Sequence, residues 1–284
     1  MSKIVGKIKD GIRFGIMEWS LKKVRRQHGW DETINEMKRL HPDLSKQYTE
    51  DISITNYYDL KIRNQHCFQV KFSVKAILEN FDKNKAELNV VDIGDSAGTH
   101  LEYISNIIQG GALVHGTSVN LDENAVNKIN SDGGHAVLCR AEEYNPEKGL
   151  DFFLSYQMVE HLHNPALFFH RLAKANTATM MIITVPYVKN SRVALRYSLN
   201  GGVNDITAEQ EHIFELSPND WKKLLLHSGW QVIDSEIYYQ YPRKIPFVSP
   251  ICSYVWKKND FEGFLGLVLK RDMAIADRYR DWED

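Results

Sequence analysis

Short apolar runs alternate with helical patterns from about Asn89 onward. The runs have the length and the β-branched or aromatic content of buried strands. Parallel strands need crossover connections, which helices supply, so the alternation predicts a parallel sheet covered on both faces. The predicted strands are 89–94, 112–119, 136–140, 151–157 and 179–187, and the predicted helices are 99–109, 123–130 and 165–176.

The last third of the chain has a different pattern. A helix is expected at 217–228, with Ser217 as its N-cap and Gly229 as its stop. Two long strand candidates follow, at 230–241 and 264–270. The segment between them holds three prolines and is expected to be a loop, which excludes a helical crossover. We therefore expect these strands to pair antiparallel at one edge of the sheet.

The first 80 residues contain two long helical patterns, at 3–26 and 58–80. A chain of 284 residues suits one α/β domain with an extension. The sequence thus predicts a helical N-terminal extension over 1–80 and a doubly wound α/β domain over 81–284.

Residues 1–30 carry eight Lys or Arg against two acidic residues, together with Phe14 and Trp19. A cationic amphipathic helix of this kind can lie on an anionic membrane surface. It can equally cover a substrate pocket or pack against a second subunit, and soluble domains often carry such helices. We favour a helix that covers the pocket or packs against a second subunit, as in a homodimer, over peripheral membrane contact through residues 1–26, which stays open.

The composition is that of a soluble globular protein, with 43% hydrophobic and 25% charged residues. Lys plus Arg (35) nearly cancels Asp plus Glu (37), which argues against a broad nucleic-acid-binding surface. The three cysteines form no CxxC pair, and no apolar run approaches the ~20 residues that cross a bilayer. We expect a cytoplasmic protein that binds no nucleic acid.

The segment after the first predicted strand carries the strongest local signal. Residues 90–99 read VVDIGDSAGT, an apolar strand that runs into small residues and then a helix. Glycines let the backbone approach a ligand, and the helix N-terminus offers N–H groups, so a nucleotide site is expected here.

The same loop matches G-x-S-x-G, the nucleophile elbow of α/β-hydrolases, with Ser96 as the nucleophile. A hydrolase elbow follows several strands and an upstream oxyanion loop, whereas this loop follows the first strand. Asp205 with His212 or His227 keeps the order of a catalytic triad formally open. An esterase is therefore an alternative, not the preferred interpretation.

Four segments in order resemble the class I S-adenosylmethionine-dependent methyltransferases that act on small molecules or glycans. They are VVDIGDSAG (90–98), DFFLSYQMVEHLHNP (151–165), IITVP (182–186) and EHIFELS (211–217). The resemblance implies a Rossmann-like, doubly wound sheet of seven strands, mostly parallel with an antiparallel edge strand. It also implies S-adenosyl-L-methionine as the cofactor.

By this resemblance, Asp92 and Gly94 lie beside the methionine part of the cofactor, where Asp92 faces its ammonium group. Gly98 closes the glycine-rich loop, and Ser96 replaces the loop's middle glycine.

The family's ribose-binding acid is replaced in this chain by Asn120, with Asp122 close by. The adenine-binding stretch corresponds to Arg140, Ala141 and Glu142, and arginine cannot accept a hydrogen bond from an amino group. The resemblance therefore leaves Asn120 or Asp122 for the ribose, and Ala141 with Glu142 for the adenine.

In methyl transfer from a sulfonium the protein mainly aligns the acceptor, and for a hydroxyl a base that removes the proton is useful but not obligatory. His161 follows the fourth strand and His212 precedes the fifth helix, and either can act as a base near neutral pH. A structural role for each stays open. His161, His163 and His212 have no carboxylate at a recognised ligand spacing, so no metal site is expected.

We expect an enzyme that methylates a small molecule or glycan, at oxygen. Aromatic and arginine residues after the fifth strand give a weak preference for a polar acceptor; they are Tyr187, Arg192, Arg196 and Tyr197. A catalytically silent nucleotide-binding module is the second alternative, suggested by Ser96, Asn120 and Arg140.

Overall fold

A computed structural model describes residues 2–47, 54–82, 84–108, 112–175, 177–195, 206 and 211–279. Asp205, Arg196 and Tyr197 lie outside these residues. The chain divides into two compact units. The first comprises Met1–Gln69 and Ile237–Phe264, and the second comprises Val70–Glu236 and Leu265–Asp284.

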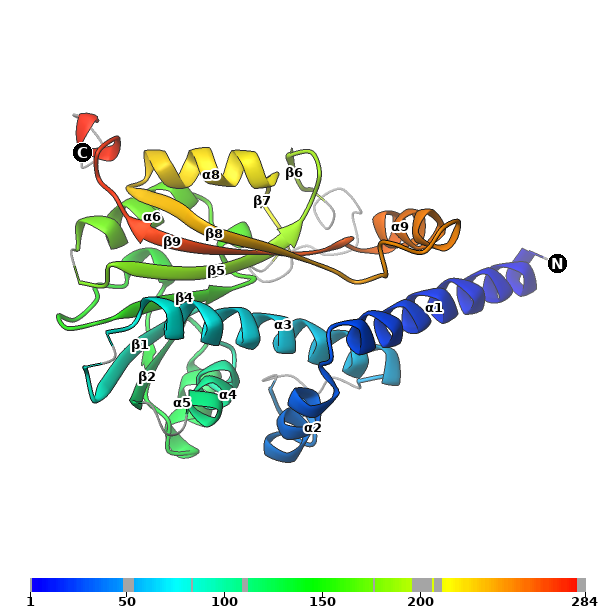
Figure 1. Cartoon of the computed structure of the whole chain (residues 1–284), viewed down its shortest axis with the longest axis horizontal. Coiled ribbons are helices and arrows are strands. Elements are labelled where there is room, and N and C mark those ends of the chain that lie inside the picture. The colour runs from blue at the N-terminus through cyan, green and yellow to red at the C-terminus, as the bar shows by residue number, and fades with distance from the viewer. Residues whose placement is uncertain are drawn as a thin grey trace. The chain divides into compact units, whose positions relative to one another are not determined.

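The second unit is built on a seven-stranded sheet with the strand order β3-β2-β1-β4-β5-β9-β8. Helices α4 and α5 lie on one face of this sheet, and α6 and α8 lie on the other (Figure 1). In chain order the elements are β1 (Glu87–Ile93), α4 (Thr99–Ile108), β2 (Leu113–Asn120), α5 (Glu123–Ser131), β3 (Ala136–Leu138), β4 (Phe152–Tyr156), α6 (Pro165–Lys174), β5 (Met180–Tyr187), α8 (Pro218–His227), β8 (Trp230–Tyr239) and β9 (Gly263–Arg271).

The five strands from β3 to β5 are parallel. The N–H of Arg271, at the end of β9, donates to the carbonyl of Thr179, just before β5, so β9 is the strand that runs in the opposite direction. The N–H of Asp272 donates to the carbonyl of Gly229, and the N–H of Gln240 donates to the carbonyl of Glu262, both at 2.9 Å. Residue numbers rise along one strand as they fall along the other, so β8 and β9 are antiparallel. The predicted doubly wound sheet with an antiparallel edge pair is confirmed.

The central strands are buried on both faces, which explains their continuous apolar sequences. All five residues of β4 and seven of the eight in β5 are buried. Phe153 and Trp230 belong to the same core, and the Trp230 indole donates to the carbonyl of Phe169 at 2.8 Å.

The segment between β8 and β9 is not the loop that its prolines predict. It contains α9 (Val248–Asn259), so that prediction was wrong. Pro250 is the third residue of this helix. A proline is tolerated in the first turn because the N–H groups there have no intrahelical partner.

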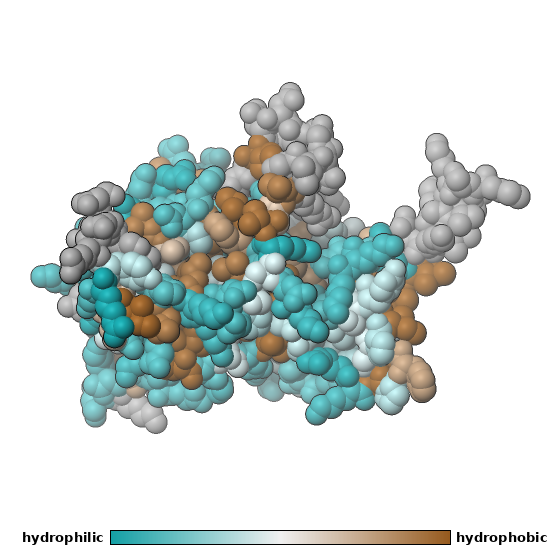
Figure 2. Space-filling view, turned by 90° about the horizontal axis from the view of Figure 1, so that it is seen from above, coloured by the Kyte–Doolittle hydropathy of each residue, from teal (hydrophilic) through white to brown (hydrophobic). Residues whose placement is uncertain are grey.

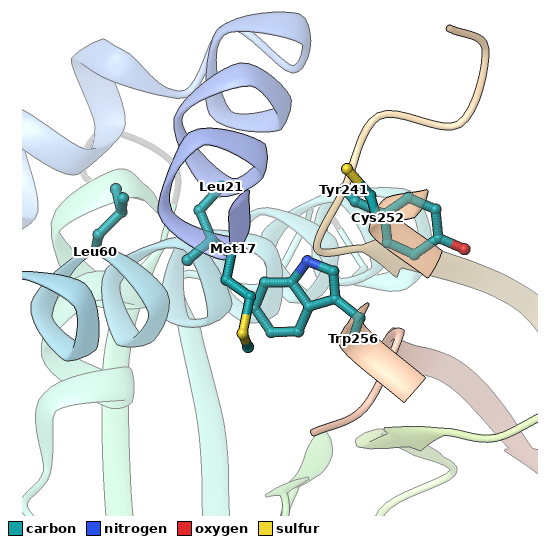
Figure 3. Close-up of a cluster of buried hydrophobic side chains, with 6 residues drawn as sticks. All are labelled: Met17, Leu21, Leu60, Tyr241, Cys252 and Trp256. Atoms are coloured by element: carbon teal, nitrogen blue, oxygen red, sulfur yellow. The ribbon is translucent and has the colours of Figure 1, made fainter. Parts of the chain in front are cut away.

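The first unit contains α1 (Ser2–Gln27), α2 (Asp31–Leu40), α9 and most of α3 (Asn56–Asn80). Its apolar cluster joins α1, α3 and α9 (Figure 3) and consists of Met17, Leu21, Leu60, Tyr241, Cys252 and Trp256. The Trp256 indole donates to the Ser20 hydroxyl at 2.9 Å, so its polar atom is satisfied inside the cluster. No helix among the described residues is long and apolar enough to cross a membrane.

Candidate functional site

A pocket of about 260 Å³ lies among the segments that follow β1, β2, β3 and β4. The carboxyl ends of parallel strands meet at one edge of a sheet, where ligands of doubly wound folds bind. Six predicted site residues line the pocket: Gly94, Ser96, Asn120, Ala141, Glu142 and His161. The other four, Asp92, Gly98, Asp122 and His212, are not among its lining residues.

Gly94 directly follows β1 and has a conformation that other residues rarely adopt, with φ of +90°. Its N–H donates to the carbonyl of Val119 at 2.8 Å, which joins the loop to the end of β2. A Cβ at this position would lie 2.5 Å from Cγ of Met158, another residue of the pocket wall. The glycine therefore allows both the turn and the close approach of the β4 loop.

Two buried carboxylates flank Gly94 in the chain, Asp92 in β1 and Asp95 in the loop that follows. Asp95 accepts hydrogen bonds from the Ser118 hydroxyl at 2.8 Å and from the N–H of Ala97 at 3.3 Å. Asp92 is fully buried, and neither of its oxygens accepts a hydrogen bond from the described residues. Nδ1 of His100 lies 3.9 Å from an oxygen of each carboxylate. Burial and the neighbouring Asp95 raise the pKa of Asp92 well above its usual range.

Asn120 and Asp122 have different surroundings. The Asn120 amide donates to the carbonyl of Asp95 at 2.7 Å and accepts from the N–H of Asp122 at 2.8 Å. The Asp122 carboxylate accepts from the N–H of Asn124 at 2.9 Å, which makes it the N-cap of α5. Of the two, Asn120 lines the pocket.

The sequence prediction missed several wall residues on the loop after β4, among them Gln157 and Met158. Gln157 has φ of +55°, which is uncommon for a residue other than glycine. Its backbone N–H and its side-chain amide both bond to Thr184, at 2.8 and 3.2 Å. Strained backbone often occurs at binding sites, but no sequence pattern reveals it.

His161 and His212 are brought together, although 50 residues separate them in the chain. Their ring centroids lie 4.6 Å apart with the planes at 89°. The N–H of Ile213 donates to the carbonyl of Glu160 at 2.8 Å, which holds the second segment beside the first.

Glu160 completes this cluster and was also missed. It is fully buried, and neither of its carboxylate oxygens accepts a hydrogen bond from another described residue. Burial raises the pKa of Glu160 to about 7, although the positive field of His212 opposes the shift. The sequence signal was its position next to His161.

The histidines considered for an esterase triad have other partners. His212 Nδ1 lies 3.3 Å from a carboxylate oxygen of Glu215, and His227 Nδ1 is hydrogen-bonded to the Tyr279 hydroxyl. The described residues show no hydrogen bond between a histidine and Ser96. The structure therefore gives the esterase interpretation no support.

No protein-family model matches the chain, and no curated protein matches its sequence. Solved structures are similar in fold. A protein of Galdieria sulphuraria described as a sarcosine dimethylglycine methyltransferase has a TM-score of 0.51 at 13% identity, over 85% of this chain and 99% of its own.

Two further structures share the fold. Geranyl diphosphate C-methyltransferase from Streptomyces coelicolor has a TM-score of 0.50 at 8% identity, over 84% of this chain and 98% of its own. The cyclase SpnF has a TM-score of 0.51 at 10% identity, over 79% and 85%. The structural similarity establishes a common fold, and identities this low leave the reaction open.

Proposed function

We propose that this chain, which has the fold of the class I S-adenosylmethionine-dependent methyltransferases, transfers a methyl group from that cofactor to a small molecule. The observation that carries the proposal is the pocket at the carboxyl ends of β1, β2 and β4, where Gly94 brings the backbone to its wall. A nucleotide-containing cofactor fits this position of a doubly wound sheet.

Asp92 would bind the methionine part of the cofactor, and Asn120 would bind its ribose. The buried Asp92 carboxylate lacks hydrogen-bond donors, and the cofactor's ammonium group would supply them. The Asn120 amide retains one N–H and one lone pair beyond its two bonds within the protein, which matches a ribose diol. Asp122 is committed to capping α5, so we assign the ribose to Asn120.

The remaining cofactor contacts are Glu142 with Ala141 at the adenine, and Ser96 and Gly98 in the loop after β1. Glu142 lines the pocket and can accept a hydrogen bond from an exocyclic amino group. Gly98 has φ of +74°, which allows the loop to turn into α4.

The proposed reaction is O-methylation of a small molecule or glycan. An acceptor oxygen attacks the methyl carbon, the carbon–sulfur bond breaks, and its electron pair stays on sulfur, giving S-adenosylhomocysteine. The hydroxyl proton passes to a base. His161 at the pocket wall and His212 beside it are the candidates for that role.

Binding of S-adenosylhomocysteine to the purified chain tests the cofactor assignment. We expect calorimetry to show one site per chain and no comparable binding of NAD. Mass spectrometry of candidate acceptors should then show a gain of one methyl group. Absence of S-adenosylhomocysteine binding would contradict the proposal.

A second function is a cofactor-binding protein that catalyses a different reaction or none. The cyclase SpnF shares the fold, so this fold does not determine the chemistry. Binding of S-adenosylhomocysteine without methylation of any acceptor in a broad panel would favour this alternative.

We also propose that the first unit contacts an anionic membrane surface from the cytoplasm. One face of α1 is buried in the apolar cluster, whereas Ile12, Phe14 and Trp19 are exposed by 61, 42 and 44%. Figure 2 shows apolar residues, in brown, at several places on a surface that is otherwise mostly hydrophilic. The excess of Lys and Arg in residues 1–30 suits acidic lipids.

Replacement of Ile12, Phe14 and Trp19 by serine should release the protein from vesicles that contain phosphatidylserine. We expect the wild-type chain to co-sediment with these vesicles and not with neutral ones, because insertion and charge attraction act together. Ile233→Ser is the matched control, since Ile233 is 44% exposed in the second unit. Equal recovery of the triple variant and wild type would contradict membrane contact through α1.

A further inference from the structure

We propose that Glu160, His161 and His212 form a binding site for a divalent transition metal ion beside the cofactor pocket. The sequence alone predicted no metal site, because it shows no carboxylate at a recognised spacing from the histidines. The fold supplies one. Each of the three residues offers a ligand atom, and these atoms lie within 4.8 Å of one another.

The site is assembled from two segments of the second unit. Glu160 and His161 belong to the short 3-10 helix Val159–His161, which follows β4. His212 lies just before β7 (Phe214–Glu215), which pairs with β6 (Arg192–Val193). The backbone bond from Ile213 to Glu160 fixes the distance between the segments.

Glu160 gives the strongest argument for a cation. Its side chain is fully buried, and no other described residue donates a hydrogen bond to either oxygen. A buried carboxylate in this condition is costly unless it is paired with a charge or coordinates a metal ion. A metal held between Glu160 and the two imidazoles supplies that charge.

The surroundings of the histidines are those of metal ligands. Nδ1 of His161 lies 3.0 Å from the carbonyl of Glu211, and Nδ1 of His212 lies 3.3 Å from the carboxylate of Glu215. Ligating histidines commonly donate one ring N–H to a carbonyl or a carboxylate and bind the metal through the other nitrogen. Nε2 of each ring is accordingly assigned to the metal. Glu215 is itself held by an ion pair with Arg192.

Two imidazoles and one carboxylate favour Zn²⁺, Co²⁺, Fe²⁺ or Mn²⁺ over Mg²⁺ and Ca²⁺, which prefer oxygen ligands alone. Three protein ligands leave a coordination position open for another molecule, as in catalytic zinc sites. His161 also lines the pocket, so that position borders the space of the proposed acceptor.

A role in catalysis rests on the proposed function. With both histidines as ligands, neither would serve as the base, and an acceptor hydroxyl at the open position would lose its proton to solvent water more readily, because a divalent cation stabilises the oxyanion. The inferred substrate class is a molecule with a hydroxyl or enol oxygen that can reach the metal. A second group of potential ligands, Asp92, Asp95 and His100, is part of the cofactor site described above, and Asp95 is already bonded within the protein.

Titration of the tag-free, metal-depleted full chain with Co²⁺ tests the site directly. We expect one Co²⁺ per chain, visible d–d absorption and displacement by Zn²⁺. Glu160→Gln and His212→Ala should each weaken binding by at least 10-fold. His115→Ala is the matched control, because His115 is an exposed histidine on β2 that is neither in the cluster nor in the pocket lining, and this variant should bind Co²⁺ as wild type does.

Affinity for S-adenosylhomocysteine, measured on the same proteins without metal, separates this inference from the proposed function. We expect it to be unchanged in Glu160→Gln and His212→Ala, which also shows that both variants fold. Absence of stoichiometric Co²⁺ binding in wild type, or equal binding in both variants, would overturn the metal site while leaving the cofactor assignment intact. Loss of S-adenosylhomocysteine binding by wild type would overturn the proposed function alone.

Discussion

Asp92→Asn is expected to weaken S-adenosylhomocysteine binding by about 100-fold, a loss typical of removing one partner of a buried charge pair. The same substitution should raise the melting temperature of the unliganded protein at pH 7. Both expectations follow from one feature, a fully buried carboxylate without hydrogen-bond donors among the described residues. Its charge destabilises the unliganded fold and is compensated when the ammonium group of the cofactor binds.

The stability change should depend on pH in a definite direction. Burial and Asp95 raise the pKa of Asp92 in the folded chain, so the folded state holds the Asp92 proton to higher pH than the unfolded state does. Stability is therefore lost as pH rises above the unfolded pKa of about 4, until the folded pKa is passed. Asparagine does not titrate. The gain in stability of the unliganded Asp92→Asn variant over wild type should accordingly be greatest at neutral pH and disappear near pH 4.

Asp132→Asn is the control for this experiment, because Asp132 is an exposed aspartate just after α5. It should change neither the melting temperature nor the affinity. Calorimetry and thermal denaturation between pH 4 and 8 measure both quantities. Unchanged affinity in Asp92→Asn would show that the cofactor's ammonium group lies elsewhere.

The sheet could be predicted because its central strands are buried on both faces. Burial of this kind demands continuous apolar sequence, as in β4 and β5, and the turn residues between strands then mark the crossovers. The prediction of a loop for the segment that forms α9 was wrong because the local signal there is ambiguous. Its prolines carry two meanings, a break in a helix or the beginning of one, and the sequence does not distinguish them.

The site was predictable where it depends on one loop and not where it depends on tertiary contacts. Gly94 and Ser96 follow directly from the strand-loop-helix pattern and line the pocket. Glu160 is different. Its burial and its proximity to His212 arise only when β7 and the 3-10 helix after β4 come together through the Ile213 bond. No periodicity within either segment encodes that contact.

Gly94→Ala is expected to destabilise the protein by about 2 kcal/mol or more and to weaken S-adenosylhomocysteine binding by at least 10-fold. Two effects add. The positive φ of +90° is unfavourable for alanine, and the new methyl group would lie 2.5 Å from Cγ of Met158. Relief of that clash must move Met158 or the loop, and both belong to the pocket wall.

Gly133→Ala separates the two effects of the Gly94 substitution. Gly133 has nearly the same φ, +88°, but no atom lies within 4 Å of a Cβ built there, so alanine at this position reports the backbone cost alone. Chemical denaturation should show a smaller loss of stability for Gly133→Ala than for Gly94→Ala, and calorimetry should show unchanged affinity. Adding Met158→Ala to Gly94→Ala should remove the clash. The stability loss of the double variant relative to Met158→Ala alone should then fall to that of Gly133→Ala, which is the backbone cost. Equal stabilities of the two single variants, with wild-type affinity in both, would mean that Met158 does not press on this loop and that Gly94 does not shape the cofactor pocket.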